Sequence, residues 1–209
     1  FKLLIKKFLP KQLIRFALYY RIIKIWSKTN FLKNAPQHIK ELVFEKYGII
    51  NSLDIDGTFL GKTTNFLKER YPHLYTIEPE VSLYNNALER FNGKNVTLYN
   101  DTSENVLPKL LKNLSGNLNF WLDGHYSEGI TFKGKKNCPV EDELNAIEIN
   151  LSNFNQITIL IYDVRCFLPQ NTRYSDYPSI NYLVDWARRL NMSWRIENDI
   201  FIIQKTKIY

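Results

Sequence analysis

The apolar run Phe120–Leu122 ends in three residues that could do chemistry, Asp123, Gly124 and His125. Gly124 permits a sharp bend in the backbone, so that the neighbouring carboxylate and imidazole can face one site. A histidine titrates near neutral pH and can take a proton from a substrate hydroxyl group. We therefore predict that His125 is a general base, and that Asp123 either orients it or shares a metal ion.

Acidic residues also stand at the ends of the other apolar runs that we predict to be strands. In an open parallel sheet, ligands bind outside the carboxyl ends of the strands, near the point where the strand order reverses. A row of acids at that edge favours a cationic or hydroxyl-rich ligand. In chain order these acids are Asp54 and Asp56, Glu78, Asp101, Asp123 and Asp163.

The segment Asp56–Gly61 brings two glycines and a threonine directly after the first predicted strand. Gly57 and Gly61 would let the backbone approach a ligand closely, and the N–H groups that open the next helix could hold a carboxylate. We expect Asp56, Gly57, Thr58 and Gly61 to contact a bound cofactor. The alternative is an ordinary tight turn.

Two further strand ends could hold the polar parts of a nucleoside. Glu78 follows the glycine turn by about twenty residues and could accept hydrogen bonds from ribose hydroxyl groups. Asp101 and Thr102 could bind an adenine amino group. For Glu78 the alternative is a strand end that simply faces solvent.

Asp163 ends the fifth predicted strand, next to the strand that ends at Asp123. The two carboxylates could share a divalent cation such as Mg²⁺ through their oxygen atoms. Arg165 could instead neutralise Asp163. Both interpretations remain open from the sequence.

The segment 127–137 reads as a basic loop. It contains two glycines and three lysines, Gly129, Lys133, Gly134, Lys135 and Lys136. A loop of this kind could close over an anionic substrate such as a phosphate or a nucleotide-linked sugar. The alternative is a solvated loop with no such role.

Alternating strand and helix patterns must position these residues. The predicted strands are 49–55, 74–77, 96–99, 118–122 and 157–162, and the predicted helices are 37–47, 62–70, 81–91, 102–113, 139–151 and 179–190. They follow from short apolar runs and from helical spacing of apolar residues. Repeated βαβ units imply a doubly wound parallel sheet with helices on both faces.

The last part of the chain breaks this alternation. Segments 192–197 and 200–205 are both strand-like, and only Asn198 and Asp199 lie between them, which predicts a β-hairpin. We therefore predict an α/β protein with a mostly parallel, seven-stranded, Rossmann-like sheet of the methyltransferase type and a C-terminal antiparallel hairpin. Dehydrogenase-type sheets differ because their alternation of strands and helices continues.

The composition fits one globular domain in a reducing compartment. The chain has 209 residues, of which 44% are hydrophobic, enough for a sizeable core. Its two cysteines, Cys138 and Cys166, form no CxxC pair. The sequence therefore excludes a disulfide scaffold and a structural zinc site, and we expect a cytoplasmic protein.

Positive charge is concentrated at the start of the chain. Residues 1–40 contain ten Lys and Arg and no Asp or Glu, whereas the whole chain has 28 basic and 21 acidic residues. The rest of the chain is therefore mildly acidic. The net charge of +7 comes entirely from residues 1–40, so it does not indicate that the rest of the chain binds nucleic acid. We divide the chain into a basic helical arm, 1–34, and an α/β domain, 35–209.

The arm mixes its cations with large apolar residues. Its longest uncharged run, Phe16–Tyr20, is far shorter than the ~18 residues of a membrane-spanning helix. Apolar residues lie almost all round the helix expected at Lys11–Lys28, which blurs the two-faced pattern of a surface helix and favours a helix that packs on the domain. The alternatives are a basic helix on an anionic membrane surface and, third, a contact with nucleic acid. The membrane contact would place the protein peripherally at the inner face of the membrane.

From about Ala35 onward, the chain resembles a bacterial family of class I S-adenosylmethionine-dependent methyltransferase-like proteins, often found beside glycan and surface-polysaccharide genes. The most specific match is the string Trp-Leu-Asp-Gly-His-Tyr-Ser at Trp121–Ser127. Other matching segments are 36–47, 57–61, 75–78, 101–108, 129–131, 138–144, 159–163 and 176–179. The resemblance implies the fold and the binding of S-adenosylmethionine.

Two places depart from the pattern of that family. It usually has Glu-Thr-Gly-Thr at the first strand end, where this chain has Ile55–Thr58 (Ile-Asp-Gly-Thr). Its fifth strand usually ends in two adjacent acids, and here the first of them is Tyr162. A metal site is therefore less expected in this chain than in its relatives.

Together, these features predict methyl transfer from S-adenosylmethionine to a hydroxyl group of a sugar or glycan precursor, with the protein aligning donor and acceptor. The expected partners are a small-molecule or glycan substrate, anionic if the basic loop closes on it, and no nucleic acid. Two alternatives remain: a non-catalytic domain of this fold that binds a nucleotide or sugar, and a membrane-docking protein that acts through residues 1–34.

Overall fold

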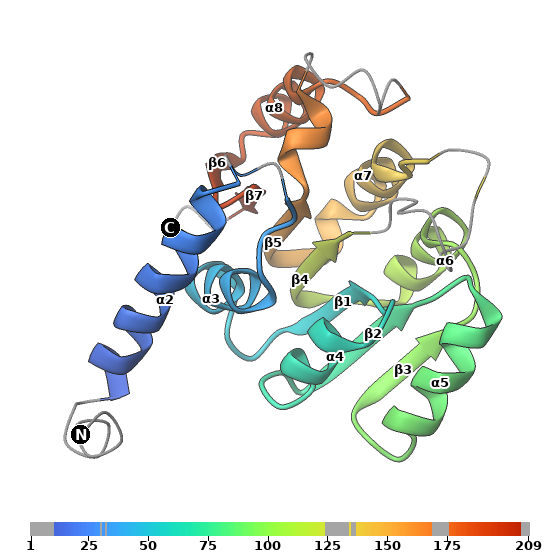
Figure 1. Ribbon diagram of the computed structural model, residues 1–209. Coiled ribbons are helices and arrows are strands. Elements are labelled where there is room, and N and C mark those ends of the chain that lie inside the picture. The colour runs from blue at the N-terminus through green and yellow to red at the C-terminus, as the bar shows by residue number, and fades with distance from the viewer. Residues whose placement is uncertain are drawn as a thin grey trace.

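A seven-stranded β-sheet forms the centre of the protein, and helices lie on both of its faces (Figure 1). The computed structural model describes residues 11–29, 31, 33–123, 134, 137–168 and 176–205. The strand order is β3-β2-β1-β4-β5-β7-β6. The predicted α/β class, with a mostly parallel seven-stranded sheet, is confirmed.

The first five strands are parallel to one another, and β7 runs antiparallel to both of its neighbours. β1 pairs with β2 and β4, β2 with β3, and β4 with β5, all in parallel, whereas β7 pairs antiparallel with both β5 and β6. The strands are β1 (Leu53–Gly57), β2 (His73–Ile77), β3 (Val96–Tyr99), β4 (Gly116–Leu122), β5 (Phe154–Tyr162), β6 (Ser193–Glu197) and β7 (Ile200–Lys205).

The predicted C-terminal hairpin is confirmed, and its turn explains the direction of β7. Asn198 and Asp199 both have positive φ, 53° and 66°. Two consecutive residues with positive φ make the tight turn whose twist matches that of antiparallel strands. The chain therefore reverses directly from β6 into β7.

Helices α4 (Lys62–Leu67), α5 (Val81–Phe91), α6 (Ser103–Leu110) and α7 (Val140–Ile149) connect the five parallel strands. Helices α2 (Lys11–Ser27) and α3 (Gln37–Tyr47) precede β1, and α8 (Ile180–Arg189) leads from β5 to the hairpin. Within the described part of the chain, no helix is long and apolar enough to cross a membrane.

Two apolar clusters cover the two faces of the sheet. Along β5, the side chains of Ile157, Ile159 and Ile161 belong to the larger cluster, and those of Leu160 and Tyr162 to the smaller one. This division follows from the two-residue period of a strand, which sends successive side chains to opposite faces. The strand is therefore buried on both sides, as its continuous apolar run predicts.

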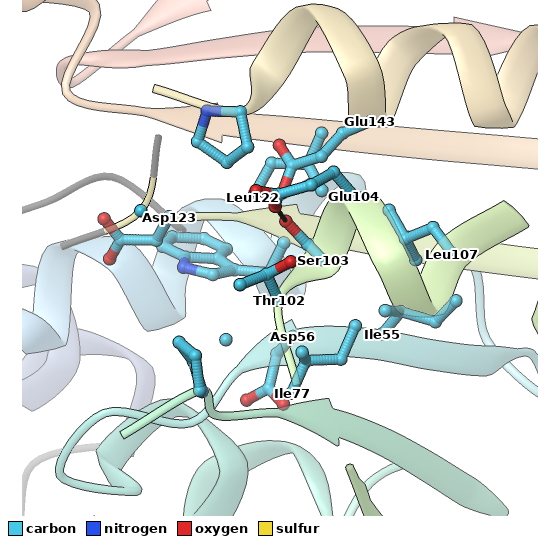
Figure 2. Close-up of a pocket in the computed structure, with 15 residues that line it drawn as sticks. Ile55, Asp56, Ile77, Thr102, Ser103, Glu104, Leu107, Leu122, Asp123 and Glu143 are labelled. Atoms are coloured by element: carbon cyan, nitrogen blue, oxygen red, sulfur yellow. Dashed lines mark hydrogen bonds between the residues drawn. The ribbon is translucent and has the colours of Figure 1, made fainter. Parts of the chain in front are cut away.

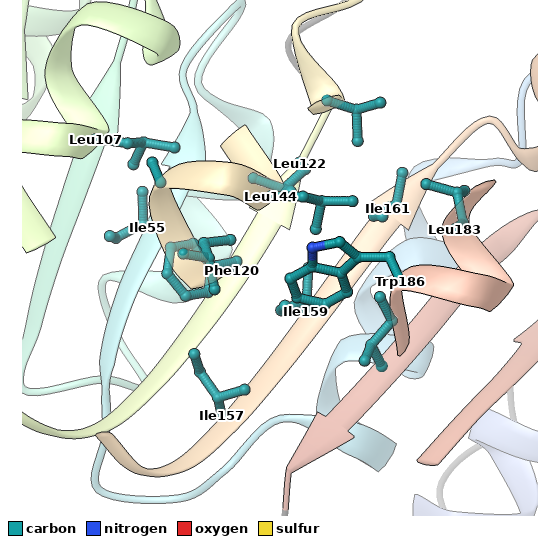
Figure 3. Packing of buried hydrophobic residues seen from close by; sticks show 14 of the residues in the cluster. Ile55, Leu107, Phe120, Leu122, Leu144, Ile157, Ile159, Ile161, Leu183 and Trp186 are labelled. Carbon is teal, nitrogen blue, oxygen red and sulfur yellow. The ribbon is translucent and has the colours of Figure 1, made fainter. Parts of the chain in front are cut away.

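The larger cluster lies between the sheet and helices α6, α7 and α8. Figure 3 shows Phe120 of β4 and Ile159 of β5 beneath Leu144 of α7 and Trp186 of α8. On the other face, Phe44 of α3 packs over β4 in the smaller cluster. The two clusters hold the central strands, whose ends carry the site.

The predicted position of the first strand was wrong by several residues. β1 begins at Leu53 and runs through Asp56 and Gly57, which we predicted as a turn. Ile49 and Ile50 precede it in a loop, where Ile50 is 80% exposed and the hydroxyl group of Ser52 donates a hydrogen bond to the carbonyl of Ile49. The apolar residues Ile49 and Ile50 therefore suggested a strand that begins several residues too early.

Helix α2 is joined to the body of the protein through its C-terminal half. The indole N–H of Trp26 donates a hydrogen bond of 2.7 Å to the carbonyl of Lys33, and Trp26 shares the smaller cluster with Ala35 and Ile39. The predicted division between an arm, 1–34, and a domain, 35–209, stays a prediction.

Candidate functional site

A pocket opens at the C-terminal edge of the sheet, where β1 and β4 lie side by side (Figure 2). The chain passes from β1 outward to β2 and β3 and then returns to β4 on the other side of β1, so the strand order reverses here. Ligands of open α/β sheets bind at such a reversal. Its cavity volume is about 70 Å³, and the pocket is partly open to solvent.

Acidic side chains dominate the polar lining of this pocket. Asp56, Glu104, Asp123 and Glu143 line it, and among the described lining residues there is no Lys, Arg or His. The other walls are mainly apolar, with Trp121 and Leu107 as the largest. The pocket therefore suits a ligand that has both an apolar part and a positive charge.

Asp56 brings a buried carboxyl group to the floor of the pocket. Its side chain is 2% exposed, and its Oδ2 accepts a hydrogen bond of 2.8 Å from the hydroxyl group of Thr64. Its Oδ1 has no hydrogen-bond partner among the described residues. Burial raises the pKa of Asp56 to about 7, although hydrogen bonds from Thr76 and Thr64 oppose the shift.

Gly57 leaves open space beside Asp56. A Cβ atom built on Gly57 would meet no other atom within 4 Å, and the residue lines the pocket. A ligand can therefore approach the backbone at the end of β1 more closely than any larger residue would allow.

The N-terminus of α6 forms the next wall. Thr102 stands at the N-cap position, and its buried Oγ1 has no hydrogen-bond partner in the part of the chain that the structure describes. Thr102, Ser103 and Glu104 all line the pocket. This end of a helix offers backbone N–H groups and a hydroxyl group that a ligand could use.

Glu143 is a pocket residue that the sequence analysis missed. It lies in the first turn of α7, is 2% exposed and lines the pocket. Figure 2 shows it beside Glu104, on the side of the pocket away from Asp56. The signal was the helical spacing, because Glu143 stands directly before Leu144 and four residues before Ile147, on the buried side of α7.

Asp123 lies at the rim of the pocket, where α3 holds it. The ammonium group of Lys40 lies 3.3 Å from its Oδ2 and 3.3 Å from the centre of the Tyr162 ring. The side chain of Lys40 is 13% exposed. A cation–π contact with Tyr162 and an ion pair with Asp123 therefore fix one ammonium group between the ends of β4 and β5.

The metal interpretation of Asp123 and Asp163 gains no support. Asp163 is 2% exposed, and its Oδ1 accepts a hydrogen bond of 2.8 Å from the guanidinium group of Arg165. Asp123 faces Lys40 instead. Among the described residues, no three His, Cys, Asp or Glu side chains are grouped so that they could hold a metal ion. Arg165 neutralises Asp163, which was the alternative that we left open.

Glu78 supports the turn that contains Gly57 and Gly61. Its Oε2 accepts a hydrogen bond of 2.8 Å from the N–H of Phe59, and its Oε1 accepts one of 3.0 Å from the N–H of Glu80. Burial raises the pKa of Glu78. Its carboxylate therefore ties the turn to the end of β2.

Thr58 and Gly61 also act within the turn and do not line the pocket. The hydroxyl group of Thr58 is buried and lies 2.6 Å from that of Thr76. Gly61 has a φ of +67°, and a Cβ atom there would lie 3.0 Å from the ring of Phe91. Both residues shape the turn, whereas we had expected them to contact a cofactor.

Asp101 lies outside the pocket. It is exposed, and its Oδ1 accepts hydrogen bonds of 2.8 Å from the N–H of Thr102 and from the side-chain amide of Asn105. These contacts lower the pKa of Asp101. Asp101 therefore bonds to the residues that begin α6, whereas Thr102 lines the pocket, and the prediction that the two bind an adenine amino group stays a prediction.

Gly124, His125 and the lysines Lys133, Lys135 and Lys136 lie outside the described residues. The prediction that His125 is a general base, and the prediction of a basic loop that closes over the substrate, therefore stay predictions. Gly134 is described, and it lines the pocket.

Comparisons with known proteins identify the fold. A protein from Sulfolobus solfataricus described as a type 11 methyltransferase superposes with a TM-score of 0.50 at 15% sequence identity, over 84% of this chain and 94% of that one. The chain has the methyltransferase fold. No protein-family model and no curated protein matches it.

Two further solved structures are similar at lower scores. A methyltransferase from Streptococcus mutans in complex with SAH gives a TM-score of 0.48 at 16% identity, over 83% of this chain and 98% of that one. An rRNA methylase from Streptococcus thermophilus gives 0.47 at 18% identity, over 85% and 99%. At these identities, the similarity extends to the arrangement of the chain and not to a substrate.

Proposed function

We propose that the protein transfers a methyl group from S-adenosylmethionine to a hydroxyl group of a sugar or glycan precursor. The observation that carries this proposal is the acid-lined pocket at the reversal of a methyltransferase-type sheet. S-adenosylmethionine has a positively charged sulfonium and ammonium group and an apolar adenine ring, which match the charge and the walls of this pocket.

The residues present fit this cofactor. Gly57 leaves the space that a ligand backbone contact needs, and Asp56 Oδ1 and Thr102 Oγ1 are buried polar atoms without partners among the described residues. Buried polar groups are normally hydrogen-bonded, so such atoms at a pocket wall favour a ligand that completes them. Asp56 would hold a cationic group, and Thr102 with Glu104 the adenine end.

The bound cofactor supplies an electrophilic methyl group. The chain's own residues have to align the acceptor oxygen with it and remove the proton of that oxygen. We assign proton removal to His125 and its orientation to Asp123, which Lys40 holds at the rim of the pocket. The lysines of residues 133–136 would attract an anionic group on the acceptor.

No metal ion is needed in this proposal. A divalent cation between the ends of β4 and β5 would have to replace Lys40 at Asp123 and Arg165 at Asp163. These two side chains already supply positive charge at both carboxylates.

Titration calorimetry with S-adenosylmethionine and S-adenosylhomocysteine tests cofactor binding directly. We expect saturable binding of both, and about tenfold weaker binding of S-adenosylmethionine to Asp56→Asn because a buried charge-assisted contact is lost. Asp101→Asn is the matched control, an acid at a neighbouring strand end outside the pocket, and should bind normally. The absence of heat with either ligand at millimolar concentration would refute the enzyme proposal.

One observation favours a non-catalytic domain as a second candidate. Both oxygens of the Glu78 carboxylate already accept hydrogen bonds from the backbone, at the place where a ribose contact was expected. Nucleotide-sugar binding without binding of S-adenosylmethionine, measured in the same calorimeter, would select this candidate.

A further inference from the structure

The outward face of α2 carries a pattern that methyl transfer does not use. Its exposed cations Arg21 and Lys24 lie three residues apart, and the exposed Lys28 follows four residues later, directly after the helix ends, so that the three form one stripe. Large apolar side chains are exposed on both sides of this stripe. They are Leu13, Phe16 and Tyr20 on one side and Leu18 and Ile25 on the other.

The opposite face of α2 is fixed to the protein, so the exposed face has a defined direction. Tyr19, Ile22 and Ile23 pack against the smaller apolar cluster, which contains Trp26. The amide of Asn198 donates a hydrogen bond of 3.2 Å to the hydroxyl group of Tyr19. Figure 1 shows α2 at one edge of the molecule, with α3 beside it.

The exposure of the apolar side chains is large. Phe16 is 67% exposed and Tyr20 is 64% exposed. Single exposed apolar residues are normal on a protein surface, but a group of five along one helix marks a contact with another phase or molecule.

The positive charge of the N-terminal region favours a negatively charged binding partner. Residues 1–40 hold ten Lys and Arg and no Asp or Glu. A second copy of this helix would bring like charges together, which opposes self-association through this face. A nucleic acid would use the cations but would leave Phe16, Leu13 and Ile25 without apolar partners.

We propose that the outward face of α2 binds the surface of an anionic phospholipid bilayer. Large apolar side chains enter the boundary between headgroups and acyl chains, and the cations pair with the phosphates. The sequence of residues 1–10, Phe-Lys-Leu-Leu-Ile-Lys-Lys-Phe-Leu-Pro, continues the same mixture of cations and apolar residues. The pocket would then work beside a membrane, where lipid-linked substrates are found.

Co-sedimentation of the full chain with vesicles tests this proposal. We expect binding to vesicles of phosphatidylcholine with phosphatidylglycerol, little binding to phosphatidylcholine alone, and weaker binding as salt is raised. Lys24→Glu with Lys28→Glu should reduce partitioning by about tenfold or more. Phe16→Ser with Ile25→Ser should reduce it to a similar degree.

Matched controls separate the surface from general effects of charge and hydrophobicity. Lys109→Glu with Lys112→Glu on the α6 side, and Ile149→Ser at the end of α7, change exposed residues far from α2 in the sequence and should bind as the unchanged protein does. Circular dichroism of every variant shows whether it is folded.

Four results would overturn the proposal. They are no binding to anionic vesicles, equal binding to neutral ones, a dimer in light scattering that Phe16→Ser abolishes, and binding of duplex RNA that needs the lysines but not Phe16. Calorimetry with S-adenosylmethionine is unaffected by any of them, so this proposal and the proposed function fail separately.

Discussion

At the scale of single residues, the carboxyl group of Asp56 differs from most acids of the chain because it is closed off from water. Burial raises its pKa from 3.8 to about 7. Between these pH values the folded protein holds a proton that the unfolded chain has released. The protonated form therefore stabilises the fold fully below about pH 4, and this contribution is lost as the pH rises through 7.

We predict that Asp56→Asn flattens the dependence of stability on pH. The contribution of Asp56 is on the order of 4 kcal/mol over its range, at 1.36 kcal/mol for each pKa unit. Urea unfolding of the ligand-free protein between pH 4 and 8 measures it. Glu89→Gln, at an exposed position, should leave the slope as it is. Asp54 is also buried and its pKa is raised in the same direction, so some slope should remain in Asp56→Asn.

We expect different roles for Gly57, which leaves space for the ligand, and Gly61, which allows the backbone conformation of the turn. Gly57→Ala adds a methyl group in open space at the pocket, so stability should change little while affinity for S-adenosylmethionine falls. Gly61→Ala forces a side chain into a left-handed backbone and against the ring of Phe91, which should cost about 1–2 kcal/mol of stability. Thermal melts and calorimetry on both variants measure stability and affinity. If Gly61→Ala lowered the affinity for S-adenosylmethionine more than Gly57→Ala did, the ligand would lie beside Gly61 and not beside Gly57.

At the scale of elements, Lys40 links α3 to the ends of β4 and β5. We predict that Lys40→Met lowers the rate of methyl transfer by about 10- to 100-fold, because Asp123 loses the partner that holds it. The affinity for S-adenosylmethionine should stay nearly the same, because Lys40 does not line the pocket. Lys46→Met is the control on the same helix. Its ammonium group pairs with Glu197, away from the pocket. A loss of cofactor affinity in Lys40→Met would argue against a positioning role.

The elements differ in how well the sequence predicted them. β5 and the hairpin follow from an apolar run and a two-residue turn, which are local signals. β1 was misplaced because it buries Asp54 and Asp56 in its centre. Carboxylates are rare in buried strands. The hydroxyl group of Thr64 on the following helix α4 binds Asp56, whereas neither carboxylate oxygen of Asp54 has a hydrogen-bond partner among the described residues.

The residues of the site, like the strands, could be predicted from the sequence only in part. The strand-end rule places Asp56 and Asp123 at the pocket, because all parallel strands end at one edge. Asp101 and Glu78 do not line this pocket, because Asp101 bonds to Thr102 and Asn105 at the start of α6 and Glu78 bonds to the backbone of the turn. Which way a side chain turns after its strand ends depends on contacts that no strand pattern contains.

At the scale of the whole molecule, Arg165 joins segments that lie far apart in the sequence. Its guanidinium group bonds to Asp163 after β5, to Asp199 in the hairpin and to Asn34 before α3. Asp163 and Asp199 are 2% and 8% exposed. One partly buried cation therefore pairs with two carboxylates and connects Asn34 with Asp199.

We predict that Arg165→Met destabilises the protein by about 3–5 kcal/mol, because two buried carboxylates lose their cation. The double variant Arg165→Met with Asp199→Asn should recover part of this loss, because one of the two uncompensated charges is removed. Urea unfolding at pH 7 measures both variants and the single Asp199→Asn, which completes a double-mutant cycle. If the variants' effects simply add, the three segments are held by their apolar contacts, and the Arg165 cluster is a consequence of the fold and not one of its supports.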